Sequence, residues 1–207
     1  MWKKLLFVIV VVSALLLSGA AQAAHDVTRP GDIIQGVPND GISQNSNHGW
    51  PGNEPPHQAI DDRIDTKYLH FKGEIQPTGI RITPAVGATV VIGLSFTTAN
   101  DAVPRDPIRY ELSGSNESID GPWTLIAAGP IVDFAGGTWP RRTKNTTPIR
   151  FANDVAYKHY QLMFPAVFNP GGANSMQIAE VELLAADLTA INPSPANGAI
   201  GVQTPLI

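Results

Sequence analysis

The sequence contains no cysteine, and this absence is the first feature that restricts its chemistry. Without thiols the chain cannot form disulfide bonds, thiolate metal sites or a cysteine nucleophile. Basic side chains are also few, because 14 Lys and Arg stand against 18 Asp and Glu and give a formal net charge of −4 at pH 7. A nucleic-acid-binding surface needs concentrated positive charge to displace counterions. The composition therefore indicates no nucleic-acid partner.

A long apolar run occurs only at the N-terminus. Lys3 and Lys4 precede an apolar run over residues 5–17, and the small residues of 21–23 follow it. The run is shorter than the roughly 20 residues that span a bilayer, and this order of features is typical of a secretory signal peptide. We predict that residues 1–23 are removed, that the protein is secreted to an extracellular or periplasmic location, and that no membrane span remains after cleavage. An uncleaved anchor is the alternative.

The sequence also lacks the pattern of an amphipathic helix, because no segment repeats its apolar residues with a period of 3.6. Short segments with a period of two recur instead, separated by clusters of Gly, Pro, Asn and Asp. We predict strands at residues 33–37, 67–71, 78–83, 89–98, 108–112, 123–127, 157–164 and 176–184. This pattern favours an all-β antiparallel sandwich or barrel. Its predicted core includes Phe96, Trp123, Leu125, Tyr160 and Leu162.

Hard oxygen ligands are concentrated in one turn, within residues 58–69. Asp61 and Thr66 offer side-chain oxygens, and the polar turn between them exposes backbone carbonyls. Ca²⁺ takes about 6 to 8 oxygen ligands and tolerates irregular geometry. One short loop rarely fills such a shell, so a second segment is needed, and Ala179-Glu180 is the best donor. The alternative is a solvated acidic turn in which Asp61 bonds its own backbone.

Four further segments resemble successive strands of the discoidin, or coagulation-factor type C, domain family. They are NDAVPRDPIRYELSGSN at 100–116, GPWTL at 121–125, YKHYQL at 157–162 and IAEVEL at 178–183. Many bacterial carbohydrate-binding modules belong to this family. The resemblance implies a galactose-binding-like jelly-roll β-sandwich over residues 32–186, preceded by an N-terminal lead at 24–31. Residues 187–207 are rich in Pro and Gly and are predicted to be a linker or the start of a further module of a longer chain.

The resemblance also implies a structural calcium site at the acidic turn. Family members that bind Ca²⁺ use an Ala-Ile-Asp-Gly-Asx-x-x-Thr loop and a Glu of the last strand. The implied ligands are the side chains of Asp61, Thr66 and Glu180 and the backbone carbonyls of Gln58, Arg63 and Ala179. The sequence departs from the family pattern twice, because Asp62 replaces the usual Gly and Arg63 replaces the usual Asn or Asp.

Sugar-binding members of the family use loops at one end of the sandwich. An aromatic ring stacks on the apolar face of the sugar there, and polar side chains bind its hydroxyls. The loop residues with this chemistry are Trp50, His57, His70, Arg105, Trp139, Arg141, Arg142, Phe168 and Asn169.

Several of these candidates also have a purely structural interpretation. Trp50 could cap the end of the sandwich, and Trp139 could pack into the core. His70 could be a strand residue whose hydrogen bonds are satisfied internally. Arg105 could form an ion pair with Asp106 in its own turn.

The acidic residues do not form a hydrolase pair in the sequence. Asp61, Asp62 and Asp65 lie too close together in one loop to flank a glycosidic bond, where carboxylates face each other about 5–9.5 Å apart. We therefore predict a secreted, non-catalytic module that binds a glycan or other cell-surface ligand and holds a structural Ca²⁺. The alternatives are a structural or adhesion spacer of a larger surface protein and an accessory domain of a glycan-active enzyme.

Overall fold

A computed structural model describes residues 24–43 and 47–186. The predicted signal peptide (1–23) and the predicted linker or further module (187–207) lie outside the described residues. Within the described ranges, no helix has the length and apolar character needed to cross a membrane.

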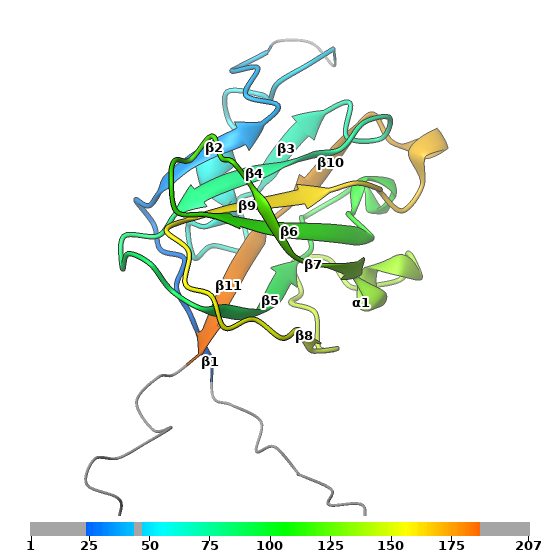
Figure 1. The fold of residues 1–207 in the computed structure, drawn as a ribbon. Helices are drawn as coiled ribbons and strands as arrows, with labels where there is room; N and C mark the ends of the chain where they lie inside the picture. The colour runs from blue at the N-terminus through cyan, green and yellow to red at the C-terminus, as the bar shows by residue number, and fades with distance from the viewer. Residues whose placement is uncertain (1–23, 44–46, 187–207) are drawn as a thin grey trace, which may run out of the picture.

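The domain consists of two layers of antiparallel strands (Figure 1). One layer is a five-stranded sheet whose strands are, in order, β2 (Ile33–Val37), β4 (Thr78–Thr83), β9 (His159–Phe164), β6 (Arg109–Ser115) and β7 (Thr124–Pro130). The other layer holds a sheet in the order β1 (Ala24–Asp26), β11 (Glu180–Ala186), β5 (Val91–Thr97) and β8 (Ile149–Arg150), together with the pair β10 (Ser175–Ile178) and β3 (Tyr68–Phe71). These sheets form the predicted all-β jelly-roll sandwich.

The core lies between the layers because alternate side chains of each strand point inward. Ile80, Leu162 and Leu112 are opposite one another on three adjacent strands of the five-stranded sheet, and all three are fully buried. Phe96 of β5 meets Phe164 of β9 across the core, with ring centroids 5.8 Å apart at an interplanar angle of 69°. This edge-to-face contact joins the two layers.

The strand predicted at 176–184 is two strands in the structure. Residues of β10 pair with β3, whereas those of β11 pair with β5, and Ala179 lies between them. The Ala179 N–H donates to the Thr97 carbonyl at 3.0 Å, at the point where the chain changes partner. Glu180 consequently begins β11 and faces the loops at that end of the sandwich.

The prediction that Trp123 and Leu125 belong to the core is wrong. The pairing of β6 with β7 shifts register between Leu112 and Ser113, which places Leu125 opposite Ser113. Ile126 has no partner in this ladder, so the alternation of side chains between the two faces changes across the bulge, and Leu125 is 63% exposed. Trp123 is half-buried and lies beneath the Arg81 guanidinium, 5.7 Å from the ring centroid.

The predicted N-terminal lead at 24–31 is part of the sandwich. Strand β1 pairs with β11, with Ala24 opposite Ala186, and Val27 is buried in the core. The sequence of residues 24–31 did not indicate a strand, because a strand of three residues is too short to show alternation of apolar and polar residues.

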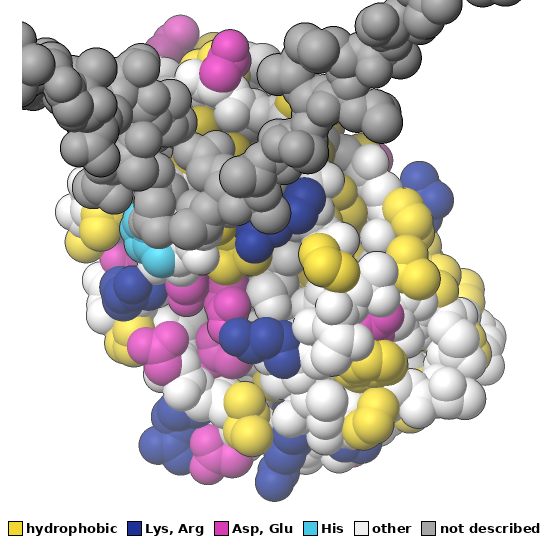
Figure 2. Space-filling view, turned by 90° about the horizontal axis from the view of Figure 1, so that it is seen from below, with side chains coloured by type: hydrophobic (Ala, Val, Ile, Leu, Met, Phe, Trp, Pro, Cys, Tyr) yellow, Lys and Arg dark blue, Asp and Glu magenta, His cyan; other side chains and the backbone are white. Residues whose placement is uncertain are grey.

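The connections contain four short helical segments. They are η1 (Pro56–Ala59), η2 (Val103–Arg105), α1 (Val132–Ala135) and η3 (Pro170–Gly172). The surface seen from below the view of Figure 1 carries acidic and basic side chains side by side among apolar ones (Figure 2).

Candidate functional site

The acidic turn begins where η1 ends. Ala59 and Ile60 are buried and fix the chain in the core directly before Asp61. Asp62 has a φ of 60°, in the left-handed region that Asp enters more readily than most residues. The replacement of the family glycine by Asp62 is therefore compatible with the turn, which continues through Thr66 into β3.

Two carboxylates from distant parts of the chain meet at this turn. The Arg63 N–H donates to Asp61 Oδ1 at 3.1 Å and to Glu180 Oε1 at 2.9 Å. The Thr66 hydroxyl donates to Asp61 Oδ2 at 2.8 Å. The structure thus brings together Asp61, Arg63, Thr66 and Glu180 in the combination that the sequence indicated.

The electrostatics of the turn favour a positive charge. Burial of the Glu180 carboxyl, followed by its hydrogen bond with Asp61 and by the negative charges of Asp61 and Asp62, raises the pKa of Glu180 to about 9. When two carboxylates share a site, their repulsion raises the pKa of one of them, and a bound cation would oppose that shift.

The other oxygens available here are neutral. The Arg63 carbonyl lies 3.3 Å from the Thr66 hydroxyl, and Ala179 directly precedes Glu180. The described ranges contain no group of three or more His, Cys, Asp or Glu side chains suited to a metal ion. The oxygens gathered at the turn are carboxylate, hydroxyl and carbonyl oxygens, which suit Ca²⁺ better than a transition metal. The roles of the Gln58 and Ala179 carbonyls stay predictions; the Gln58 side chain accepts from the Lys67 N–H at 3.3 Å.

Lys67, which follows the turn, is a buried cation that sequence reasoning missed. Its ammonium group lies 2.7 Å from Asp101 Oδ1, 3.0 Å from Gln177 Oε1 and 3.6 Å from Glu54 Oε1. Because lysine is rarely buried, a lysine beside an acidic turn is expected to be exposed. Its contacts connect the segment before η1, the loop before η2 and strand β10.

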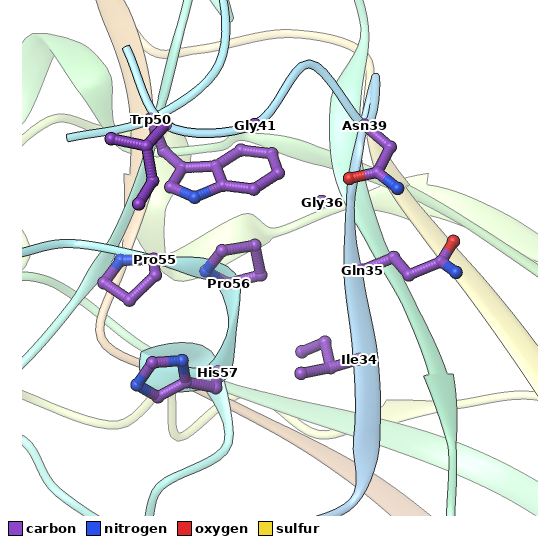
Figure 3. A pocket seen from close by; sticks show the side chains of 10 residues that line it. Ile34, Gln35, Gly36, Asn39, Gly41, Trp50, Pro55, Pro56 and His57 are labelled. Atoms are coloured by element: carbon purple, nitrogen blue, oxygen red, sulfur yellow. The ribbon is translucent and has the colours of Figure 1, made fainter. Parts of the chain in front are cut away.

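A cleft lies between β2 and η1 (Figure 3). Its lining residues precede the acidic turn in the sequence. Its volume is about 430 Å³. The lining residues are Ile34, Gln35, Gly36, Asn39, Gly41, Ile42, Trp50, Pro55, Pro56 and His57. Figure 3 shows the indole and the rings of Pro55, Pro56 and His57 facing the strand that carries Ile34.

Trp50 forms the floor of this cleft. It is 7% exposed and packs edge to face on Tyr68, with centroids 6.2 Å apart, and on His70, with centroids 5.8 Å apart. The indole reaches this position because β2 has Gly36 there, where a Cβ would lie 2.4 Å from Trp50 Cζ3. Trp50 therefore closes the end of the sandwich and also lines the cleft, together with His57.

The prediction that His70 contacts a ligand is wrong for this structure. The side chain is fully buried between Trp50 and Tyr68. Its Nδ1 lies 2.7 Å from the Phe71 carbonyl and its Nε2 lies 2.9 Å from the Pro38 carbonyl. Both ring nitrogens face backbone carbonyls inside the protein, as in the structural alternative.

The expected ion pair between Arg105 and Asp106 is replaced by a longer-range one. The Arg141 guanidinium binds both Asp106 carboxylate oxygens, with Nη1 2.8 Å from Oδ1, and also donates to the Asp101 carbonyl at 2.9 Å. Burial raises the pKa of Asp106, although Arg141 opposes that shift. Because the guanidinium already has these partners, the assignment of Arg141 to a ligand is not supported by its geometry.

The remaining candidates lie on loops that do not line the cleft. Trp139 is half-buried against the core, and its Nε1 donates to the Thr143 carbonyl at 3.1 Å. Phe168 packs on Gly137, where a Cβ would lie 2.1 Å from the ring. The other members of this group, which are partly or fully exposed, are Arg105, Arg142 and Asn169.

The fold is that of a galactose-binding-like jelly-roll domain. Comparison of the sequence finds no matching family model and no matching curated protein. Comparison of the structure finds the same fold in carbohydrate-binding modules of family 32.

Two of these family 32 modules and a chitosan-binding module are covered almost completely. A family 32 module of Clostridium perfringens NanJ, solved with galactose, has a TM-score of 0.55 and 16% identity over 78% of this chain and 99% of its own. CpGH89CBM32-5 of the same species, in complex with GalNAc-β-1,3-galactose, has a TM-score of 0.54 and 17% identity over 79% and 100%. Chitosan-binding module 1 of a chitosanase/glucanase from Paenibacillus sp. IK-5 has a TM-score of 0.54 and 13% identity over 78% and 99%. At these identities the similarity establishes the fold.

Proposed function

We propose that this chain is a non-catalytic carbohydrate-binding module. The observation that carries the proposal is the cleft of about 430 Å³ between β2 and η1. The chain also has the same fold as modules solved with galactose and with GalNAc-β-1,3-galactose, and this likeness supports the proposal.

The chemistry of the cleft suits a sugar. A pyranose ring has an apolar face and a rim of hydroxyl groups, so it needs an apolar surface beside a few polar side chains. Pro55, Pro56 and Trp50 supply apolar surface, and Asn39 and His57 supply exposed polar groups.

A glycan array probed with the purified protein tests this function. We expect retention of a limited set of glycans, with no change in the glycans after incubation. Failure to retain any glycan would contradict the proposal and favour a structural or adhesion spacer. Release of sugar from a retained glycan would contradict the non-catalytic part.

We propose in addition that the acidic turn holds a structural Ca²⁺. The side chains of Asp61, Thr66 and Glu180 would supply ligands, with the carbonyls of Gln58, Arg63 and Ala179 as further donors. When bound, the cation neutralises the two carboxylates. The chain's own contribution is to hold the turn against the start of β11 through the Arg63 N–H.

We also propose that the protein is exported after removal of residues 1–23. N-terminal sequencing of protein recovered from outside the cytoplasm tests this proposal. A mature N-terminus near Ala24 is expected, whereas an intact Met1 would contradict it.

A further inference from the structure

The cleft between β2 and η1 differs from the pocket beside the acidic turn, whose lining includes Glu54, Asp65 and Lys67, in the kind of polar group that lines it. Among the residues that the structure describes, the lining of the cleft contains no Asp, Glu, Lys or Arg. The polar side chains among its lining residues are the amides of Gln35 and Asn39 and the imidazole of His57. We propose that the cleft takes a neutral sugar, bound as a terminal residue, and discriminates against acidic and amino sugars; this inference rests on the proposed carbohydrate-binding function.

The two walls of the cleft divide the recognition between them. Figure 3 shows the Gln35 side chain leaving β2 on the side away from Trp50, while Ile34 points toward His57. This alternation is what a strand imposes, so Ile34 presents apolar surface to the cleft and Gln35 contributes mainly backbone. Asn39 and His57 are both exposed and stand on opposite walls. An amide and an imidazole can each bind hydroxyl groups without supplying a formal counter-charge to a carboxylate, sulfate or ammonium group.

The cost of placing a charged sugar here gives the discrimination its physical basis. A carboxylate or ammonium group that enters an apolar cleft loses hydration and gains no ionic partner. A neutral hydroxyl or acetamido group loses less and recovers hydrogen bonds from Asn39 and His57. Specificity of this kind comes from the penalty against the wrong ligand as much as from contacts to the right one.

The size of the cleft fits a chain end. Ligand pockets range over about 300–1,000 Å³, and a volume of about 430 Å³ lies near the lower limit. Trp50 is 7% exposed and cannot serve as an extended stacking platform. The cleft is therefore suited to one sugar ring and part of the next, in contrast to an open groove that follows a polymer.

Isothermal titration with matched neutral and charged probes tests the inference. The pairs are lactose with 3′-sialyllactose and N,N′-diacetylchitobiose with the deacetylated chitobiose. We expect at least one neutral probe to bind about tenfold or more tightly than its charged partner. Asn39→Ala and His57→Ala should each weaken that binding about 5- to 10-fold, as the loss of one hydrogen bond does. Glu117→Ala, in the exposed turn between β6 and β7, is the control and should leave it unchanged, whereas Asn169→Ala tests the loop of η3 as the alternative location.

The outcomes separate this inference from the function on which it rests. Equal or tighter binding of the charged partners would overturn neutral selection while leaving carbohydrate binding intact. Binding that is lost in Asn169→Ala and retained in Asn39→Ala and His57→Ala would overturn the location. Absence of binding to all four probes, together with an empty glycan array, would overturn both. Circular dichroism of each variant verifies that a loss of binding is not a loss of folding.

Discussion

The acidic turn and the cleft lie at the two ends of the short segment 55–66, yet they are built in opposite ways. In the turn, the polar atoms of Asp61, Thr66 and Glu180 already contact one another and the Arg63 backbone. In the cleft, Asn39 and His57 are exposed on walls made of proline and isoleucine. The turn is organised to hold the fold together, whereas the cleft leaves polar groups available to a ligand. Changes at the turn should therefore alter stability first, and changes at the cleft should alter binding first.

The largest expected effect is at the turn. Chelation of Ca²⁺ should lower the free energy of unfolding by about 2.7 kcal/mol if the ion is present at about 100 times its Kd. This corresponds to a fall of about 5–10 °C in Tm for a domain of this size. Glu180→Gln should abolish the difference, because the variant lacks the second carboxylate. Differential scanning calorimetry with and without EDTA measures it.

Glu182→Gln is the matched control, because Glu182 lies two residues along β11 and pairs with Lys144 outside the turn. It should retain the full response to EDTA. Identical Tm values for the unaltered protein with and without EDTA would eliminate the structural ion and make the turn a solvated acidic loop.

The second effect concerns the buried cation next to the turn. Lys67→Met should cost about 2 kcal/mol, because Gln177 Oε1 and the Asp101 carboxylate lose a charged donor. The cost is moderate because the Asp101 side chain is 50% exposed and water can replace the ammonium group. Lys144→Met is the control, since Lys144 is 54% exposed in its pair with Glu182 and should cost about 0–1 kcal/mol. Equal losses in urea denaturation would show that Lys67 is an ordinary surface lysine.

A smaller effect on stability, but a larger one on binding, is expected at the floor of the cleft. Gly36→Ala places a methyl group 2.4 Å from Trp50 Cζ3 and 2.8 Å from the Tyr68 hydroxyl, so the indole must move. Overpacking of this kind costs about 1–3 kcal/mol, and we expect the lower limit because Trp50 lies at the end of the core. Tryptophan fluorescence and glycan titration should both change. Gly52→Ala, whose Cβ would meet Ile42 Cγ2 at 3.7 Å, should change neither.

The smallest effect is a pH dependence far from both sites. Burial opposes ionisation of Asp133, but hydrogen bonds from Thr147 and Thr146 outweigh it and lower the pKa of Asp133 below 3.8. A lowered pKa gives stability that is present above pH 4 and is lost as the pH falls through the folded-state value. Asp133→Asn should lose about 0.5 kcal/mol at pH 7 and show a flatter acid limb in thermal melts. An unchanged acid limb would contradict this assignment.

The sequence was most informative where one residue type repeats with a fixed period. Ile80, Ile82, Tyr160 and Leu162 alternate with polar residues, so their strands and their burial could be predicted. Leu125 also lies in a predicted strand, but the strand has a register shift in its pairing with β6, and Leu125 points outward. Periodicity describes a single strand, whereas a bulge is a property of two.

The same limit applies to the sites. The turn could be anticipated because Asp61, Arg63 and Thr66 are close in sequence, and Glu180 was expected because one short loop rarely fills the coordination shell of Ca²⁺. The cleft was identified only through Trp50 and His57, because its shape depends on a glycine in β2 that admits an indole from a loop fourteen positions later. His70 and Arg141 have side-chain types common in sugar sites, but tertiary contacts with Pro38 and Asp106 occupy them.

The pairing of Ala24 with Ala186 has a mechanical consequence. Strands β1 and β11 are antiparallel, so the chain enters β1 and leaves β11 at the same end of the sheet, at the bottom of Figure 1. Tension applied between these ends would separate the two strands one residue pair at a time, in the manner of a zipper, instead of shearing a whole ladder at once. Under load the domain should yield first at this seam, while η1 and the cleft stay folded.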